Sequence, residues 1–383
     1  MLDGVKVALG VTGSIAAVKT VELAHELRRQ GAEVRAVMTD SAQGIIHPWA
    51  LEYATENPVV TEITGAVEHV ELCGREGWAD LLLIAPTTAN TVGKMAAAVD
   101  DSPVTTCATT AFGADVPLVV VPAMHEPMYD HPGVLEALDQ LESWGVDFVD
   151  PRIEEGKAKI ATEDAIVTAA ARATGAQPLA GQTVIVTSGA TTESVDPIRT
   201  LSNRASGQTG RAVARACVTH GAEVVLVHDG PEVPWADTVA VESAAEMRDA
   251  VLDRAPEADA LVSAAAIADY TVEAADEKIR SGQDLALDLE PTPKLLDAVR
   301  ESHPELALVG FKAETEGDED AIVAQARALQ DRVGLAFVVG NDAGVMGADE
   351  TTALVVDGDD VCEVTGSKQA LGAAVADRLA AVC

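Results

Sequence analysis

The sequence is poor in aromatic residues and in basic residues, and each shortage excludes a class of protein. Aromatic residues make up 3% of the 383 residues, whereas hydrophobic residues make up 48%, so the core must be built from aliphatic side chains. Lys and Arg number 26 against 62 Asp and Glu, which gives a formal net charge of -36. Such a charge disfavours binding to nucleic acid or to an anionic membrane. The composition is that of an Ala- and Val-rich globular α/β protein.

Cysteine pairs and long apolar runs are also missing. The five cysteines are scattered and include no Cys-x-x-Cys pair, so neither a zinc site nor a disulfide framework is indicated, and we expect reduced thiols. No run approaches the roughly 18 apolar residues of a membrane span. The N-terminal MLDGVKVALG lacks the basic and long apolar segments of a signal peptide. We therefore expect a cytoplasmic protein without a membrane partner.

The apolar pattern alternates between strands and helices, and it does so twice. VKVALGV, an amphipathic run over residues 15–29 and AEVRAVM predict a strand, a helix and a strand, before further strands at ADLLLIA and PLVVVPA. After the linker-like ATGAQPLAGQ the pattern restarts with TVIVTS, SGQTGRAVARACVTHG and AEVVLVHD. The sequence thus predicts an α/β fold with two Rossmann-like parallel-sheet domains, residues 1–177 and 178–383. DGDD between two β-prone runs predicts a hairpin before a last helix from about Ser367.

Both halves begin with a strand that runs into a Gly/Ser/Thr-rich turn, GVTGS in the first and TSGATTES in the second. Such turns offer backbone N–H groups and a helix N-terminus to a phosphate. Neither turn is specific alone, because GVTGS lacks the third glycine of GxGxxG and TSGATTES is not a P-loop; a plain tight turn would explain either. Neither turn gives the GxGxxG pattern of dinucleotide-binding domains, which also disfavours an NAD-dependent dehydrogenase.

Polar residues follow each predicted strand of the first half, in GVTGSIAAVK, VMTDSA, APTTANTVGK and PAMHEPM. The carboxyl ends of parallel strands converge on one crevice, where ligands bind. The series resembles the flavin-containing cysteine decarboxylases, and among them the phosphopantothenoylcysteine decarboxylase family, over roughly residues 4–165. The resemblance implies FMN, which would oxidise the substrate thiol so that carbon dioxide can leave. It implies flavin contacts by Gly13, Ser14, Thr39, Ser41, Thr88 and Asn90, with Ser14 at the phosphate and Lys94 adding charge nearby.

The same resemblance assigns proton chemistry to His69, in EHVEL, whose imidazole can exchange protons near neutral pH. A purely structural histidine is the alternative. Bacterial relatives have PAMN, whose asparagine holds the substrate carboxylate; this chain has PAMH, and we assign that role to His125, which can donate to a carboxylate.

The clamp segment departs further from the bacterial pattern. Bacterial relatives protonate the product from a clamp cysteine, whereas no cysteine lies between Cys107 and Cys217 here. PRIEEGKAKIA resembles an archaeal form of the clamp. A solvated charged loop is the alternative explanation of its charges. The candidates for substrate binding or proton transfer are Glu154, Glu155, Lys157 and Lys159, of which we expect Lys157 to be catalytic.

In the second half, TSGATTESVDPIRTLSNRASGQTG resembles the signature of the phosphopantothenate-cysteine ligase family, with Ala190 and Ala205 in place of a glycine and a serine. SAAAIADYT, EKIRSG, PTPKLL, GFKAET and VGNDAG extend the resemblance over nearly all of residues 180–383. It implies CTP as co-substrate, Mg²⁺, and an acyl cytidylate that the amine of cysteine attacks. It also implies roles for Asn203 at the acyl intermediate, Lys278 at the phosphates, Asp269 at the cytosine, and Ala265 and Phe311 beside the nucleotide. A turn residue and a solvated lysine are the alternatives for Asn203 and Lys278.

The two resemblances concern consecutive steps of coenzyme A biosynthesis. Cysteine would be ligated to 4'-phosphopantothenate, and the product would be decarboxylated to 4'-phosphopantetheine. We expect a bifunctional enzyme; the alternative is a ligase whose flavin-binding N-terminal half is regulatory. The families imply homo-oligomers, with trimeric decarboxylase domains and dimeric ligase domains. The sequence indicates no metal ligands.

The acidic composition predicts a halophilic protein, and the archaeal clamp suggests a haloarchaeal source. Repulsion among the surplus carboxylates is screened when the Debye length falls from about 10 Å at 0.1 M salt to about 3 Å at 1 M. We expect the thermal unfolding midpoint to rise by roughly 4 °C or more between 0.1 M and 2 M KCl, corresponding to at least about 1 kcal/mol. Scanning calorimetry tests this, and an unchanged midpoint would indicate an ordinary acidic protein.

Overall fold

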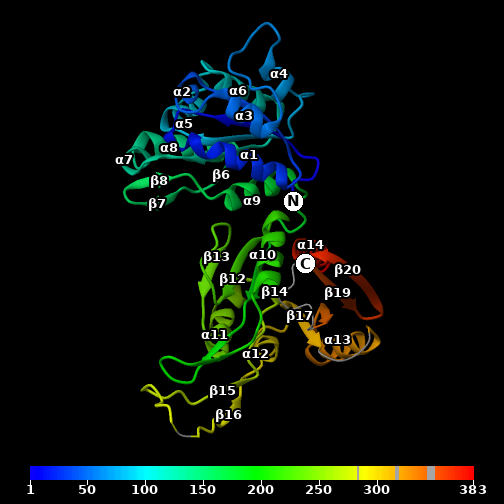
Figure 1. The fold of residues 1–383 in the computed structure, drawn as a ribbon. Coiled ribbons are helices and arrows are strands. Elements are labelled where there is room, and N and C mark those ends of the chain that lie inside the picture. The colour runs from blue at the N-terminus through cyan, green and yellow to red at the C-terminus, as the bar shows by residue number, and fades with distance from the viewer. Residues whose placement is uncertain (283, 315–318, 343–349) are drawn as a thin grey trace. The chain divides into compact units, whose positions relative to one another are not determined.

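The computed structural model describes residues 1–282, 284–314, 319–342 and 350–383. The chain divides into two compact units, Met1–Gly175 and Ala176–Cys383 (Figure 1). The boundary expected near Gln177 lies just inside the second unit. The α/β architecture with a parallel sheet in each half is confirmed.

The first unit is built on a five-stranded sheet whose strand pairs are all parallel. Its strands, in the spatial order β2-β1-β3-β4-β6, are Glu33–Met38, Lys6–Val11, Leu81–Thr87, Leu118–Pro122 and Asp147–Phe148. This is the 2-1-3-4-5 order of flavodoxin-like folds, in which the winding reverses between the first and third strands. Ligands bind at such a reversal, outside the carboxyl ends of the strands.

Helices cover both faces of this sheet because its strands are apolar on both sides. Leu81 and Leu83 of β3 pack with α1, α3 and α9, whereas Leu82 and Ile84 pack with α4, α5, α6 and α8. The helices are η1 (Ile15–Lys19), α1 (Thr20–Arg29), α2 (Asp40–Gln43), α3 (Pro48–Thr55), α4 (Glu68–Cys73), α5 (Ala89–Ala96), α6 (Pro103–Ala114), α7 (Glu126–Tyr129), α8 (Pro132–Ser143) and α9 (Glu163–Thr174).

A small antiparallel sheet adjoins the carboxyl end of β4. Its strands are β5 (Met124–His125), β8 (Lys157–Lys159) and β7 (Arg152–Glu154), in that spatial order. The segment expected to be a clamp is therefore a short hairpin paired with the PAMH segment, and we call this sheet the clamp sheet.

The second unit is built on an eight-stranded sheet that is mostly parallel. Its strands, in the order β13-β12-β9-β14-β17-β18-β19-β20, are Asp237–Ala240, Glu223–His228, Thr183–Ser188, Ala260–Ser263, Ala307–Glu314, Phe337–Asp342, Glu350–Asp357 and Asp360–Ser367. The first six follow the Rossmann order 3-2-1-4-5-6. The last two form the predicted antiparallel hairpin, which turns at Gly358 with φ +56°.

Helices again cover both faces. Val184 and Val186 of β9 pack with α10 and α14, and Ile185 packs with α11, α12 and α13. Ser367 is the N-cap of the last helix, as predicted. The helices are α10 (Gln208–Thr219), α11 (Ala244–Arg254), η2 (Ala255–Glu257), α12 (Leu295–Ser302), α13 (Glu319–Val333) and α14 (Lys368–Leu379).

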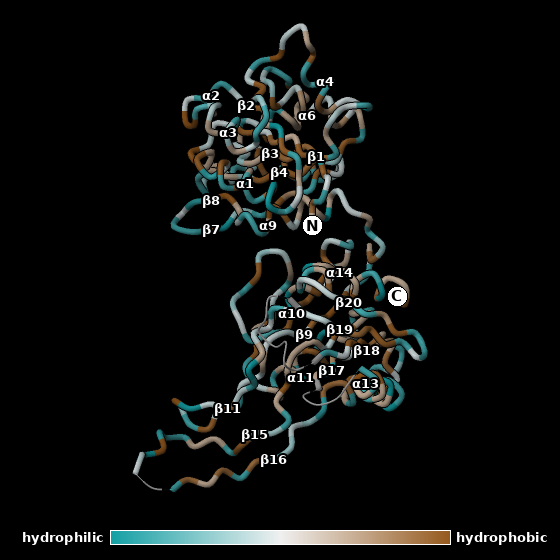
Figure 2. The backbone as a smooth tube through the Cα atoms, turned by 45° about the vertical axis from the view of Figure 1, so that its right-hand side comes forward, coloured by the Kyte–Doolittle hydropathy of each residue, from teal (hydrophilic) through white to brown (hydrophobic). Residues whose placement is uncertain are grey.

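Two short ribbons extend from the second sheet, and the apolar pattern does not signal either. One pairs β10 (Thr192–Ser194) with β11 (Thr200–Ser202), and the other pairs β15 (Tyr270–Val272) with β16 (Leu289–Pro291). Figure 2 shows the second ribbon as a projecting arm with hydrophobic residues along it. We call residues 270–291 the arm. Its exposed large hydrophobic side chains are Tyr270, Leu285, Leu287 and Leu289.

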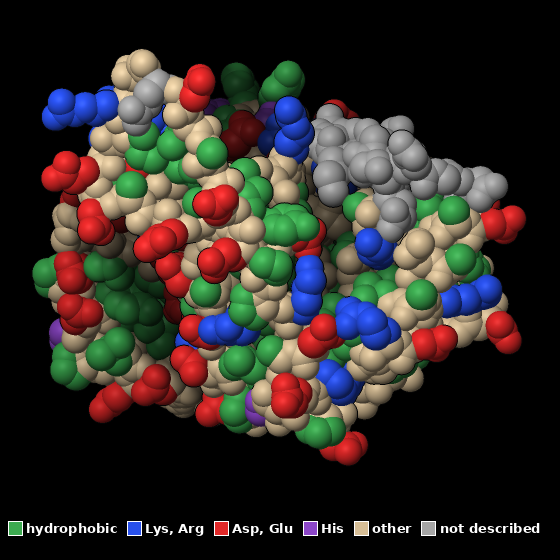
Figure 3. Space-filling model, turned by 90° about the horizontal axis from the view of Figure 1, so that it is seen from below, with side chains coloured by type: hydrophobic (Ala, Val, Ile, Leu, Met, Phe, Trp, Pro, Cys, Tyr) green, Lys and Arg blue, Asp and Glu red, His purple; other side chains and the backbone are tan. Residues whose placement is uncertain are grey.

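Acidic side chains are spread over the face of the molecule shown in Figure 3, with basic side chains between them. In the part of the chain that the structure describes, no helix combines the length and the apolar composition needed to cross a bilayer.

Candidate active sites

In the first unit, the predicted flavin-contact residues include the N-caps that follow three neighbouring strands. Ser14, Thr39 and Thr88 begin η1, α2 and α5, and each side chain accepts an N–H of its own helix. Ser14 Oγ also donates to the carbonyl oxygen of Ala123, after β4, at 3.0 Å. The capping preference of Ser and Thr therefore places three hydroxyl groups at the carboxyl edge of the sheet.

Close contacts bring the loops after these strands together. A Cβ on Gly13 would lie 2.3 Å from Ser41 Oγ, so the loops after β1 and β2 approach each other where only glycine fits. The buried Thr12 hydroxyl donates to Pro86 O at 2.8 Å and accepts from Thr88 N at 3.2 Å. It therefore joins the loops on either side of the strand-order reversal. The sequence analysis missed Thr12, although it lies in the GVTGS turn.

Two predicted contacts lie farther along α5. Asn90 is exposed in the first turn of this helix. Lys94 donates to both carboxylate oxygens of Asp101 at 2.8 Å. Its charge is thus already paired, and the structure gives no support for a role at a phosphate.

His69 lies in α4 and has a polar atom without a partner. Its Nδ1 is buried and makes no hydrogen bond within the described residues. The preceding Val67 has φ +50°, a left-handed conformation that is strained for a β-branched residue and is often found near functional sites. The other end of α4 is anchored in the core, where the neighbouring thiol of Cys73 and burial raise the pKa of Cys107. All five cysteines are free thiols, as expected.

The clamp sheet aligns three of the predicted catalytic or binding residues. His125 of β5 is the register partner of Lys157 in β8, which is in turn the partner of Glu154 in β7. Directly opposed residues of antiparallel strands have their side chains on the same face, with Cβ atoms about 5 Å apart. The imidazole, ammonium and carboxylate groups therefore form one row across the sheet, which the sequence did not reveal.

Charges along this row are unequally paired. Glu154 accepts from Lys159 at 2.9 Å and from Arg152 at 3.0 Å, and both lower the pKa of its carboxyl group. Lys159 also pairs with Glu155 at 3.2 Å. Lys157 is exposed, and no partner is recorded for its ammonium group within the described ranges. The positive charge facing His125 is therefore the one that remains available to a ligand.

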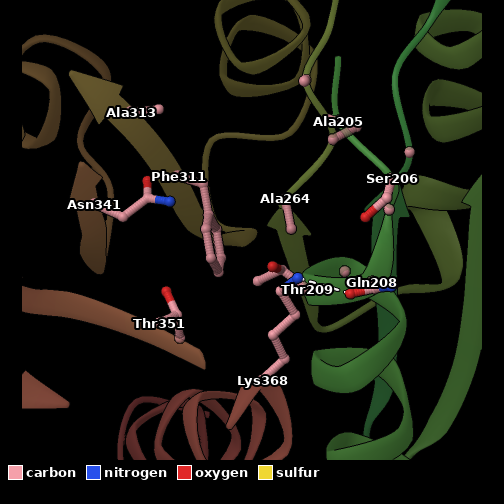
Figure 4. A pocket seen from close by; sticks show the side chains of 15 residues that line it. Ala205, Ser206, Gln208, Thr209, Ala264, Phe311, Ala313, Asn341, Thr351 and Lys368 are labelled. Atoms are coloured by element: carbon pink, nitrogen blue, oxygen red, sulfur yellow. Dashed lines mark hydrogen bonds between the residues drawn. The ribbon is translucent and has the colours of Figure 1, made fainter. Parts of the chain in front are cut away.

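The second unit contains a pocket of about 150 Å³ at the carboxyl ends of β9, β14 and β17. Figure 4 shows the Phe311 ring and the Lys368 side chain pointing into the same space. Ala265 and Phe311, which the resemblance places beside the nucleotide, line this pocket. The other lining residues are Gly189, Ala205, Ser206, Gly207, Gln208, Thr209, Gly210, Ala264, Ala266, Ala313, Asn341, Thr351 and Lys368.

Glycines allow α10 to begin directly against the end of β9. A Cβ on Gly207 would lie 2.8 Å from Gly189 N, and one on Gly210 would lie 2.6 Å from Ser188 Cβ. Ser188 Oγ fixes this approach by donating to Gly207 O at 2.7 Å. Gly207 is the N-cap in a left-handed conformation, so no side chain caps α10. The uncapped first turn can offer its N–H groups to an anion in the pocket.

The remaining ligase candidates are not among the residues that line the pocket. Asn203 is exposed, and its Nδ2 donates at 2.9 Å to the carbonyl oxygen of Ala266, a lining residue. Asp269 is exposed and paired with Lys294. Lys278 is exposed on the arm. Of the predicted GFKAET and VGNDAG segments, residues 315 and 343–344 lie outside the described residues.

A buried carboxylate that the sequence analysis missed holds the arm. Asp196, only 2% exposed, accepts backbone N–H groups of Ile198 at 2.8 Å, Arg199 at 2.8 Å and Ile279 at 3.0 Å. It also pairs with the Arg199 guanidinium, which donates to Ile279 O at 3.1 Å. Burial alone would raise the pKa of Asp196, but these donors outweigh it and lower the pKa to about 2. Asp196 and Arg199, which lie in the ligase-like signature segment, thus hold the backbone of Ile279 beside Lys278.

Neither site has a preformed metal cluster within the part of the chain that the structure describes. Among the described residues, no three or more His, Cys, Asp or Glu side chains lie close enough together to hold a metal ion.

Comparisons with known proteins cover both units. A family model described as flavoprotein matches residues 1–175, and one described as DNA/pantothenate metabolism flavoprotein C-terminal domain matches residues 179–382. The coenzyme A biosynthesis bifunctional protein CoaBC of Thermococcus kodakarensis is 48% identical over 361 residues, 93% of this chain and 89% of that protein. Its counterpart in Methanocaldococcus jannaschii is 34% identical over 385 residues, 99% of this chain and 94% of that protein.

Among solved structures, the C-terminal domain of a coenzyme A biosynthesis bifunctional protein CoaBC is 26% identical, covers 54% of this chain and 98% of that one, and has a TM-score of 0.46. The sequence relatives span nearly the whole chain and the two family models meet close to the boundary between its units. The chain belongs to the family of bifunctional coenzyme A biosynthesis proteins.

Proposed function

We propose that this chain performs both steps of that family. The second unit ligates cysteine to 4'-phosphopantothenate with CTP, and the first unit decarboxylates the product to 4'-phosphopantetheine with FMN. One observation carries the proposal: residues from separate signature segments meet at the carboxyl strand edge of each unit. In the first unit Gly13 lies against Ser41 and Thr12 accepts from Thr88, and in the second Ala265 and Phe311 line one pocket.

In the ligase unit, the CTP phosphates would lie against the uncapped first turn of α10, and the base would lie against Phe311. A carboxylate oxygen of 4'-phosphopantothenate attacks the α-phosphorus and pyrophosphate leaves. The amine of cysteine then attacks the acyl carbon and CMP leaves. Asn203 would donate to the acyl intermediate and Lys278 would neutralise phosphate charge from the arm. Because the described residues supply no metal cluster, Mg²⁺ would be held chiefly by the phosphates.

In the decarboxylase unit, the residues present fit a flavin phosphate, because the N-caps Ser14, Thr39 and Thr88 surround the strand-order reversal. A bound FMN supplies reversible oxidation of the substrate thiol. His125 and Lys157, opposed in the clamp sheet, would hold the substrate carboxylate. With no cysteine in the clamp, Lys157 is the candidate proton donor for the product. The unpartnered Nδ1 of His69 supports its role in proton transfer.

We further propose that the protein works as a homo-oligomer in a high-salt cytoplasm, with dimeric ligase units and trimeric decarboxylase units. The four large hydrophobic side chains exposed on the arm support the ligase dimer, because apolar side chains gathered on an exposed element favour an interaction there. The acidic surface supports the high-salt setting.

Product analysis tests the two activities together. The purified protein is incubated in high salt with Mg²⁺, 4'-phosphopantothenate, cysteine and CTP, and the products are identified by mass spectrometry. Formation of 4'-phosphopantetheine is the expected result. Accumulation of phosphopantothenoylcysteine would favour a regulatory first unit, a possibility that the missing clamp cysteine raises. A folded, flavin-containing protein that forms neither product would contradict both assignments.

The clamp sheet yields a paired prediction. Lys157→Gln should lower kcat/KM for decarboxylation roughly tenfold to a hundredfold, because a hydrogen bond to a charged group contributes about 1.5–3 kcal/mol. Lys159→Gln is the matched control, since that ammonium is already paired with Glu154 and Glu155. Decarboxylation of phosphopantothenoylcysteine is measured by mass spectrometry, with ligase activity of the same preparation as internal reference. Equal effects of the two substitutions would contradict the role of Lys157.

Asp196→Asn should lower ligase kcat/KM by roughly tenfold or more, since small misplacements of catalytic groups are costly, and should also destabilise the fold. Because the folded pKa is depressed from 3.8 to about 2, the stabilisation is present above pH of about 4 and is lost as pH falls toward 2. Asp297→Asn is the control, because its exposed carboxylate only pairs with Arg332 on the surface. Ligase kinetics and denaturant unfolding between pH 7 and pH 2 check both effects. If Asp196→Asn changes neither kcat/KM nor the free energy of unfolding, Asp196 does not hold the arm in place.

A further inference from the structure

We propose that Lys368 is an anion-binding residue of the second-unit pocket and holds a phosphate group of a substrate. This inference deepens the proposed ligase function and rests on it. Phosphate is offered by two substrates of that reaction, the CTP triphosphate and the 4'-phosphate of phosphopantothenate. The chemistry that Lys368 recognises is the same in both.

The first observation is the burial of this charge. Lys368 is 8% exposed, and its Nζ donates at 2.7 Å to the Oε1 of Gln208, a neutral amide. No carboxylate is recorded as its partner within the described residues. Lysine is rarely this buried unless it is paired with an opposite charge. Burying an ammonium group without a countercharge is unfavourable, and one neutral hydrogen bond offsets only part of that cost.

The second observation is the position of the charge relative to two helices. Lys368 is the first residue of α14, and its partner Gln208 is the first residue of α10. Helix N-termini carry partial positive charge and favour anions, so a cation at the start of α14, reaching the start of α10, is placed unfavourably twice. Both helices have twelve residues, long enough for a developed dipole. A phosphate in the pocket would be attracted to the ammonium group and to the start of α10, and would so offset these unfavourable terms.

The third observation is that these groups share one cavity. Lys368 and Gln208 line the pocket together with Thr209 and Phe311, and Figure 4 shows the ammonium group between the Phe311 ring and Gln208. The uncapped N–H groups of α10 and the ammonium group can therefore reach the same ligand oxygen atoms. The cavity is the one in which the nucleotide is proposed to bind.

A purely structural role makes a different prediction. Lys368 joins α14 to α10, and these helices pack so tightly that a Cβ on Gly372 would lie 2.6 Å from Ala212 O. If the hydrogen bond to Gln208 were the purpose of Lys368, removing the ammonium group would destabilise the fold. If the charge serves an anion, removing it should leave the ligand-free protein as stable or more stable, because a buried charge with no carboxylate partner among the described residues disappears.

The test compares full-length wild-type, Lys368→Met, Lys368→Arg and, as a charge-matched control, Arg332→Met, which removes an exposed guanidinium. Calorimetric titration measures binding of CTP with Mg²⁺, of 4'-phosphopantothenate, and of inorganic pyrophosphate as a probe that does not depend on the proposed reaction. Scanning calorimetry measures the ligand-free melting temperature.

For Lys368→Met we expect a melting temperature equal to or above wild type, and roughly tenfold to a hundredfold weaker binding of pyrophosphate and of one substrate, with partial rescue by Lys368→Arg. Loss confined to CTP assigns the nucleotide phosphates; loss confined to 4'-phosphopantothenate assigns its phosphate. A lower melting temperature with unchanged binding of all three ligands would overturn the inference. If wild-type protein binds neither substrate, the ligase proposal fails, and the pyrophosphate comparison still decides the role of Lys368.

Discussion

Hydrogen bonds between the loops that leave neighbouring central strands hold both candidate sites together. In the first unit the Thr12 hydroxyl joins the loops after β1 and β3. In the second unit Thr187 and Thr191 accept N–H groups from the loop after β14, at 3.2 Å from Ala265 and 2.8 Å from Ala268. Threonine suits this position because one short hydroxyl can accept and donate across the gap. These bonds hold the loops together at the point where the strand order reverses, and the candidate functional residues lie on those loops.

Anion binding is the chemical problem that this arrangement addresses in an acidic chain. Phosphates and carboxylates must be held although acidic residues outnumber basic ones by more than two to one. Many of the described lysines and arginines are already paired with carboxylates, as Lys94 is with Asp101 and Lys159 with Glu154. In the proposed mechanisms, anions are held by the uncapped backbone N–H groups of α10 and by Lys157, Lys278 and Lys368, which have no carboxylate partner among the described residues. Helix dipoles supply positive potential without adding a basic residue.

The sequence predicted those features that depend on local pattern. Buried parallel strands appear as continuous apolar runs, so both sheets and the terminal hairpin were foreseen, and Ser14, Thr39 and Thr88 follow strands as capping residues do. What it missed depends on contacts between distant segments. The row His125–Lys157–Glu154 exists only because β5 pairs with a hairpin about thirty residues later. Asp196 gains its hydrogen bond from Ile279 only when the arm folds onto it. Lys368 is the first residue of a helix, and the local sequence does not distinguish it from an exposed lysine at that position.

Amide hydrogen exchange on the full-length protein tests most directly whether the strand-edge loops bind the anionic substrates. On addition of CTP with Mg²⁺, exchange should slow in residues 205–210 and 264–266, which line the second-unit pocket, and remain unchanged in residues 12–14 and 88–91 of the first unit. Slower exchange at other segments, with none in the pocket loops, would contradict the account.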